Sequence, residues 1–122
     1  MYRGFQDAVS IPVSLTSPDY SDAGFTVPMV NASAGRDASG VVHLALVNLD
    51  PHHAVRVSTK LAGVTGGRLS GQVLTAPAIN SINTFDQPNT VRPAPFSGAH
   101  MGAGGALNVE LPPKSVVVLD IK

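Results

Sequence analysis

Eight carboxylic acids are the side chains of this sequence that are best suited to catalysis. Two carboxyl groups held a few ångströms apart can share the acid and base roles in a hydrolysis reaction. Asp37 and Asp50, however, stand in turn sequences, where aspartate caps its own backbone. Glu110 and Asp120 fall on the outward side of predicted strands. We therefore predict structural or solvated roles for all eight, which are Asp7, Asp19, Asp22, Asp37, Asp50, Asp86, Glu110 and Asp120.

Other residue types that carry chemistry are also poorly placed. The spacing of the four histidines does not put two of them on one helix face, as a helical metal site requires. No serine lies in a G-x-S-x-G turn. The glycine-rich stretches at 65–71 and 102–107 do not lead into a helix that could bind phosphate. We predict no catalytic residue, no metal and no cofactor; the histidines are His43, His52, His53 and His100.

Charge and composition restrict the class of partner. Eight basic and eight acidic residues give a formal net charge of zero, which argues against nucleic acid and anionic membranes as partners. There is no cysteine, so neither a disulfide framework nor a thiol nucleophile is available. No apolar run approaches the roughly 20 residues of a membrane span, and the start lacks the apolar block of a secretion signal. We expect a cytoplasmic protein, and note that a piece of a longer polypeptide would look the same.

Alternation of apolar and polar residues, with a period of two, predicts strands along most of the chain. The first strand should be a border strand because it contains Pro12, whereas the apolar residues on both faces of 42–47 indicate a central strand. Gly71 should mark a bulge or a close approach to the backbone. The final two strands should form a hairpin or a corner between sheets. The predicted strands lie within 9–15, 42–49, 54–62, 67–76, 107–111 and 117–121.

Turn sequences separate these strands at the spacing of an all-β domain. They read GRDASG at 35–40, LDPHH at 49–53, GVTGG at 63–67 and GAGG at 102–105. Helix signals are scarce because glycine and proline occupy 22 of the 122 positions, the sum of 12 and 10. The sequence therefore predicts one all-β domain over residues 1–122, built as a sandwich or barrel.

The segment 76–100 is too long and too polar for a hairpin loop, so we predict a crossing from one sheet to the other. Within it, NSINTFDQPNTV at 80–91 combines three asparagines with Phe85 and Pro88. We expect Asn80, Asn83 and Asn89 to bond to nearby backbone amides and so order the segment. Phe85 should anchor it by burial, with a stabilisation of roughly 2 to 3 kcal/mol.

A sugar-binding surface would need exposed aromatic rings beside polar groups. The chain has no tryptophan, and at such low density we expect the phenylalanines to be used in the core. A free-standing carbohydrate-binding module therefore stays an alternative. The aromatic residues are Tyr2, Phe5, Tyr20, Phe25, Phe85 and Phe96.

The order of the segments resembles the C-terminal domain of family 51 α-L-arabinofuranosidases. The likeness extends over MYRGFQDAVSIPVSL, VHLALVNLDP, GQVLTAPAINSINTFDQPNTV and LPPKSVVVLDI. Its most specific part is N-x-F-x-x-P-x-x-V at Asn83, Phe85, Pro88 and Val91, followed by L-P-x-x-S-V-V-V-L. The resemblance implies a jelly-roll-like β-sandwich of two antiparallel sheets that packs on a catalytic (β/α)₈ barrel.

The same resemblance implies that the catalytic residues lie in the barrel, which needs about 250 residues and cannot be contained in this chain. We therefore expect a non-catalytic accessory domain of a hydrolase that acts on arabinose-containing hemicellulose. Alternatives are the carbohydrate-binding module and a small glycosidase active by itself.

Expected partners are the barrel, a second copy of the chain through a bare interdomain face, and an arabinose-containing polysaccharide. Asn80, Asn83, Phe85 and Pro88 either shape the crossover or contact the barrel or the substrate rim. Relatives commonly carry histidine at the positions of Phe5 and Ile82, so the chain departs there from the family's pattern on the side that faces the barrel.

Overall fold

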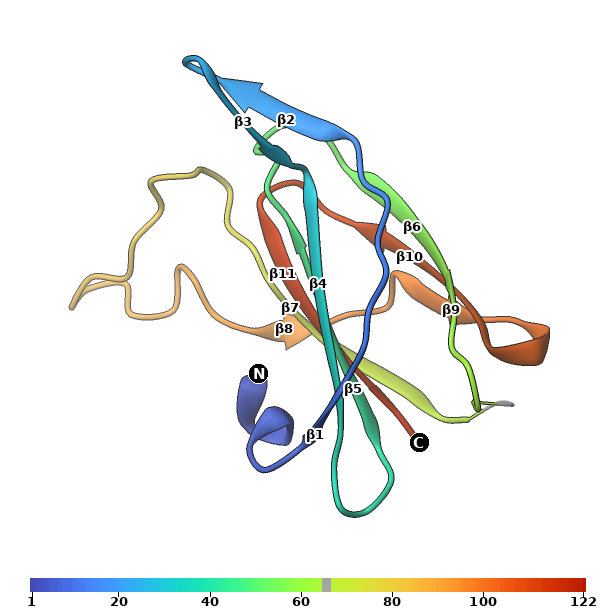
Figure 1. The fold of residues 1–122 in the computed structure, drawn as a ribbon. Helices are drawn as coiled ribbons and strands as arrows, with labels where there is room; N and C mark the ends of the chain where they lie inside the picture. Colours follow the sequence, from blue (N-terminus) through green and yellow to red (C-terminus); the bar gives the residue numbers. More distant parts are fainter. Residues whose placement is uncertain (65–66) are drawn as a thin grey trace.

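The structure is a computed structural model that describes residues 1–64 and 67–122, and it is built almost entirely of strands (Figure 1). No helix in this described part is long and apolar enough to cross a membrane. Both helical elements are single turns of 3₁₀ helix, labelled η. The elements are η1 (Tyr2–Phe5), β1 (Val9–Ile11), β2 (Asp19–Asp22), β3 (Phe25–Pro28), β4 (Val30–Arg36), β5 (Val42–Asn48), β6 (Val55–Lys60), β7 (Leu69–Leu74), β8 (Ala94–Pro95), β9 (Ala99–Met101), η2 (Ala103–Gly105), β10 (Ala106–Leu111) and β11 (Ser115–Ile121).

The strands form two sheets and a separate ribbon. The large sheet has the order β1-β4-β5-β11-β7-β8, the small sheet has the order β6-β10-β9, and β2 pairs with β3. Each pairing in the described residues is antiparallel. The predicted all-β sandwich is confirmed, and these pairings are compatible with a jelly-roll-like form.

The core lies between the large and the small sheet. Alternate residues of β5 and β11 point inward from the large sheet, and alternate residues of β10 point inward from the small one. Burial of these side chains removes apolar surface from water, which is the main driving force for stacking the sheets. The side chains with almost no exposed surface include Leu44, Leu46, Leu107, Val109, Leu111, Val117, Leu119 and Ile121.

The predicted positions of most strands are confirmed. β1 is a border strand, as Pro12 required, although it ends at Ile11 and the residues to Leu15 lie outside it. β5 is central, and its second face is covered at His43 and Ala45. Gly71 marks a close approach, because a Cβ atom there would lie 2.7 Å from a methyl carbon of Leu119.

The connection from β10 to β11 is a corner between the sheets rather than a hairpin, which decides between the two alternatives. Buried Asn48 holds this corner by donating hydrogen bonds of 2.9 Å to the carbonyl oxygens of His53 and Pro112. The hydroxyl of Ser115 donates to the same Pro112 carbonyl at 2.7 Å. A buried amide satisfied in this way stabilises the corner without an uncompensated polar group.

The β2–β3 ribbon, η1 and the two short strands β8 and β9 were not predicted from the sequence. The ribbon turns at Ala23 and Gly24, which both have positive φ, as a two-residue hairpin loop requires. These elements are short, and the residues of the β2–β3 ribbon are largely exposed. The turn predicted at 63–67 includes Thr65 and Gly66, which lie outside the described residues.

Candidate functional site

The connection between β7 and β8, residues 75–93, projects furthest from the sandwich, and we call it the projecting arm (Figure 1). It joins two antiparallel neighbours of the large sheet, so the predicted crossing to the small sheet falls after it, between β8 and β9. Asn83 closes the arm across eight residues. Its amide nitrogen donates to the carbonyl oxygen of Val91 at 2.9 Å, and its amide oxygen accepts from the Val91 backbone nitrogen at 2.7 Å. Asn83 thus makes side-chain bonds to the backbone of the kind expected for it.

A tight turn at the tip of the arm is held by further local bonds. The backbone nitrogen of Gln87 donates to the hydroxyl of Thr84 at 3.1 Å, and the Thr84 nitrogen donates to the Gln87 carbonyl at 3.2 Å. In the described part of the chain, Asn80 and Asn89 show no side-chain hydrogen bond, so their expected bonding to backbone amides is not seen. Pro88 lies exposed in the same turn region.

The predicted burial of Phe85 is wrong. Its side chain is 107% exposed, and the neighbouring apolar residues Ile79 and Ile82 are 81% and 68% exposed. The arm closes through backbone and asparagine bonds, so it needs no apolar anchor, and its apolar side chains point into solvent. The use of phenylalanine in the core is likewise wrong for Phe25, which is 79% exposed on β3.

Two of the eight carboxylates do converge, which the sequence pattern did not reveal. Asp120 lies 2.7 Å from Nδ1 of His43, and Asp37 lies 3.0 Å from Nε2 of the same ring. The imidazole ring is thus located between the two carboxyl groups, where a substrate would have to bind. Because both ring nitrogens are already bonded, His43 has no free lone pair with which to activate a nucleophile. The arrangement is a carboxylate–imidazole–carboxylate bridge, in which the ring is buried and both carboxylates are partly exposed.

The electrostatics of this bridge follow from its hydrogen bonds. Bonds from Ser39 and His43 lower the pKa of Asp37 to about 2. Burial of the ring would by itself lower the pKa of His43, but the hydrogen bonds to Asp120 and Asp37 outweigh burial and raise it above 6.5. The expected capping role of Asp37 is confirmed, because the Ser39 and Val41 backbone nitrogens donate to its carboxylate.

Asp50 also caps its own turn, as expected. Its carboxylate accepts hydrogen bonds from the backbone nitrogens of His52 and His53, and the first of these is the main reason that the pKa of Asp50 lies below its usual value. Glu110 is exposed on β10 and forms an ion pair with Arg56 on β6, with 3.7 Å between Oε2 of Glu110 and Nε of Arg56. In residues 1–64 and 67–122, no group of three or more His, Asp or Glu side chains is arranged to hold a metal ion.

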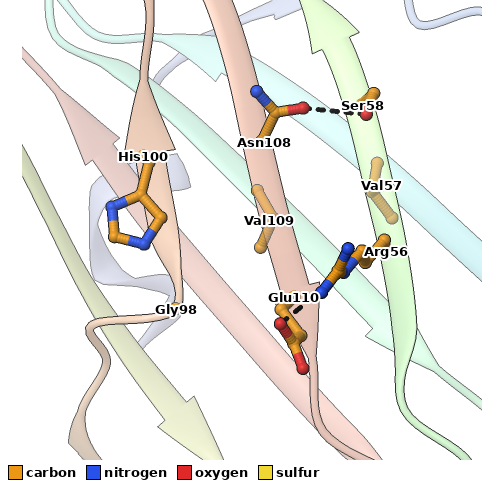
Figure 2. Close-up of a pocket in the computed structure, with 8 residues that line it drawn as sticks. All are labelled: Arg56, Val57, Ser58, Gly98, His100, Asn108, Val109 and Glu110. Atoms are coloured by element: carbon orange, nitrogen blue, oxygen red, sulfur yellow. Dashed lines mark hydrogen bonds and ion pairs between the residues drawn. The ribbon is translucent and has the colours of Figure 1, made fainter.

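A shallow depression on the outer face of the small sheet is the strongest candidate for a ligand pocket (Figure 2). Its volume is about 390 Å³, and its walls include the Arg56–Glu110 pair, the Ser58–Asn108 hydrogen bond and the ring of His100. These polar groups could bond to hydroxyls. The lining has no tryptophan, tyrosine or phenylalanine ring on which a sugar could stack.

Comparisons with known proteins point to one family. Residues 1–115 match the family described as the α-L-arabinofuranosidase C-terminal domain. An intracellular exo-α-L-arabinofuranosidase of Bacteroides ovatus is 37% identical over the whole chain, which spans 24% of that protein's length. A GH51 arabinofuranosidase of Xanthomonas axonopodis pv. citri is 40% identical, with a TM-score of 0.95 over 99% of this chain and 24% of its own.

A more distant structure, the family 51 α-L-arabinofuranosidase of Bifidobacterium longum, shares the fold at 24% identity and a TM-score of 0.75, over 88% of this chain and 21% of its own. The match with the family extends over nearly all of the present chain, and the fold and the sequence agree. The chain belongs to the α-L-arabinofuranosidase C-terminal domain family.

Proposed function

We propose that this chain is a non-catalytic accessory domain of an arabinofuranosidase-like glycoside hydrolase, which removes arabinofuranosyl groups from hemicellulose. Two observations support the proposal: the chain corresponds to only 24% of its relatives' length, and its carboxylates do not face each other across a space for a sugar. Its partner would be the catalytic barrel. A cytoplasmic location fits the Bacteroides ovatus relative, which is described as intracellular.

The single observation that carries the docking role is the exposed apolar surface of the projecting arm. Three large apolar side chains within seven residues are between 68% and 107% exposed, although local hydrogen bonds hold the backbone in place. Apolar side chains presented on an ordered segment are typical of an interface. Asn83 would preorganise the arm, Asn80 and Pro88 would flank its apolar residues, and Phe85 would enter the barrel surface.

A chimeric enzyme tests this role. The segment of the Xanthomonas axonopodis enzyme that matches this chain is replaced by residues 1–122, and Phe85→Ala is compared with Thr90→Ala, an exposed control on the same arm. We expect Phe85→Ala to shorten the half-life of the chimera's activity at elevated temperature. The same substitution should leave the free energy of unfolding of the isolated chain unchanged. Equal half-lives for both variants would contradict docking through Phe85. A large change in kcat at unchanged half-life would instead indicate contact with the substrate rim.

Two assays of the isolated chain test the alternatives. Release of 4-nitrophenol from an arabinofuranoside, abolished by a single carboxylate substitution, would overturn the non-catalytic role. Retention on insoluble arabinoxylan, lost when His100 is replaced by alanine, would favour a carbohydrate-binding module that uses the small sheet.

Sedimentation of the same sample measures self-association, which we expect to increase with concentration because the arm is bare. A strictly monomeric mass would contradict that expectation.

A further inference from the structure

The outer face of the large sheet carries a charged group that is buried by the N-terminal turn. His43 on β5 is only 5% exposed, although it points away from the sandwich core. Its neighbours on either side are Asp120 on β11 and Asp37 in the turn after β4. A titratable ring buried outside the core needs a specific cover.

That cover is η1. A Cβ atom built at Gly4 would lie 2.9 Å or less from three atoms of the His43 ring, so only glycine lets the backbone approach this closely. The ring centroids of Phe5 and His43 are 5.7 Å apart, and those of Tyr2 and Phe5 are 5.5 Å apart. The turn therefore rests directly on the imidazole.

The hydrogen-bond pattern specifies the protonation state of the ring. An ionised carboxylate only accepts hydrogen bonds, so a ring whose two nitrogens each face a carboxylate must donate from both. That condition is met by the imidazolium form. Loss of the proton would leave one nitrogen lone pair facing a carboxylate oxygen, which is a repulsive contact in a buried place.

We propose that the bridge formed by Asp37, His43 and Asp120 is a pH-dependent latch that holds η1 on the large sheet. The latch is closed while His43 carries two protons, and it opens when the ring loses one of them. Opening frees residues 2–8 from the sheet and leaves the sandwich core intact. Because a C-terminal domain is joined to its enzyme through its first residues, the latch would lie at the domain junction, a step that rests on the proposed function.

The surrounding charges agree with this device. Across the sheet from His43 lies Gly35 of β4, and across from Asp120 lies Ser70 of β7, neither of which is charged. Arg3 of η1 and Met1, with its α-amino group, line the depression beside Asp120. In the described residues, the charged and titratable groups around the latch are therefore Asp37, Asp120, Arg3 and the Met1 amino group.

The direction of the pH effect follows from the raised pKa of His43. A raised pKa means that the folded state binds the proton more tightly than the unfolded state does. The latch therefore contributes its full stability below pH 6.5 and loses it as the pH rises through the folded value. Asp37, with a pKa of about 2, stays charged throughout this range.

Nuclear magnetic resonance on the isolated chain tests the latch independently of any enzyme. The ring nitrogen shifts of His43 and the amide exchange of residues 2–8 are followed between pH 5 and pH 9. We expect both ring nitrogens to be protonated at pH 5. Protection of these amides, corrected for intrinsic exchange, should fall by up to about tenfold for each pH unit between 6.5 and the raised pKa of His43, and should level off above it. A neutral ring at pH 5, or amide protection that does not follow the titration, would overturn the proposal.

Variants separate the charge from the cover. Asp120→Asn removes one charge from a partly exposed site and should move the opening to lower pH by about one unit or more. Gly4→Ala should open the turn at every pH, since the added methyl group overlaps the ring. His100→Gln is the control, because that ring is exposed on the small sheet and its loss should change neither readout. An unchanged opening pH in Asp120→Asn would contradict the latch.

Discussion

The core strand β11 and the projecting arm are stabilised in opposite ways. In β11, Val117 and Leu119 are completely buried, and both edges of the strand are paired. In the arm, the backbone is held by Asn83 and a tight turn, while Phe85 and Ile79 stand in solvent. Burial fixes the first region and local hydrogen bonds fix the second. The difference shows that the apolar side chains of the arm are free to contact something other than their own domain.

Leu119→Ala should have the largest effect on the free energy of unfolding. The side chain is completely buried, and its removal leaves a cavity between the sheets, so we expect a loss of about 2 to 5 kcal/mol. Chemical denaturation of the isolated chain measures it. Leu49→Ala is the matched control, because that leucine is 44% exposed and should cost much less. Similar losses in the two variants would mean that the sandwich core is not where the structure places it.

Asn83→Ala should have a smaller and local effect. It removes both hydrogen bonds to Val91, each contributing about 0.5 to 1.5 kcal/mol, but these bonds are exposed and close only the arm. We expect faster protease cleavage within residues 75–93 and a small change in global stability. Asn89→Ala on the same arm is the control and should be cleaved at the original rate. Equal cleavage of the two variants would contradict the clamp.

Phe85→Ala should have the smallest effect in the isolated chain. The ring contacts solvent on all sides, so the free energy of unfolding should stay within about 0.5 kcal/mol of the original. Thermal unfolding monitored by circular dichroism provides the measurement. A loss of about 2 kcal/mol in the free energy of unfolding would mean that Phe85 is the buried anchor expected from the sequence. The contrast between core and arm would then not hold.

Local sequence patterns predicted much of this structure. The alternation in β6 and β10 identified which side chains point inward, apolar residues on both faces of β5 identified a central strand, and the aspartates at 37 and 50 were correctly placed as turn caps. Proline in the first strand correctly indicated a border. These features depend on a few neighbouring residues, for which backbone sterics and side-chain capping are decisive.

The exposure of Phe85 could not be predicted in the same way. An apolar residue in a polar segment predicts a buried anchor. The sequence does not show how far the segment lies from the core, so it cannot correct that prediction. The β2–β3 ribbon was missed for a related reason, because its strands have only four residues each and are largely exposed.

The sequence by itself determined the period-two strands, their turns and the resemblance to an arabinofuranosidase C-terminal domain. Only the tertiary structure decided that Asp120 meets His43, 77 positions away in the chain, and that the turn at Gly4 covers the ring of His43. The reason is physical: a strand's own residues set which way its side chains point, whereas strand order and register set which side chains meet across a sheet.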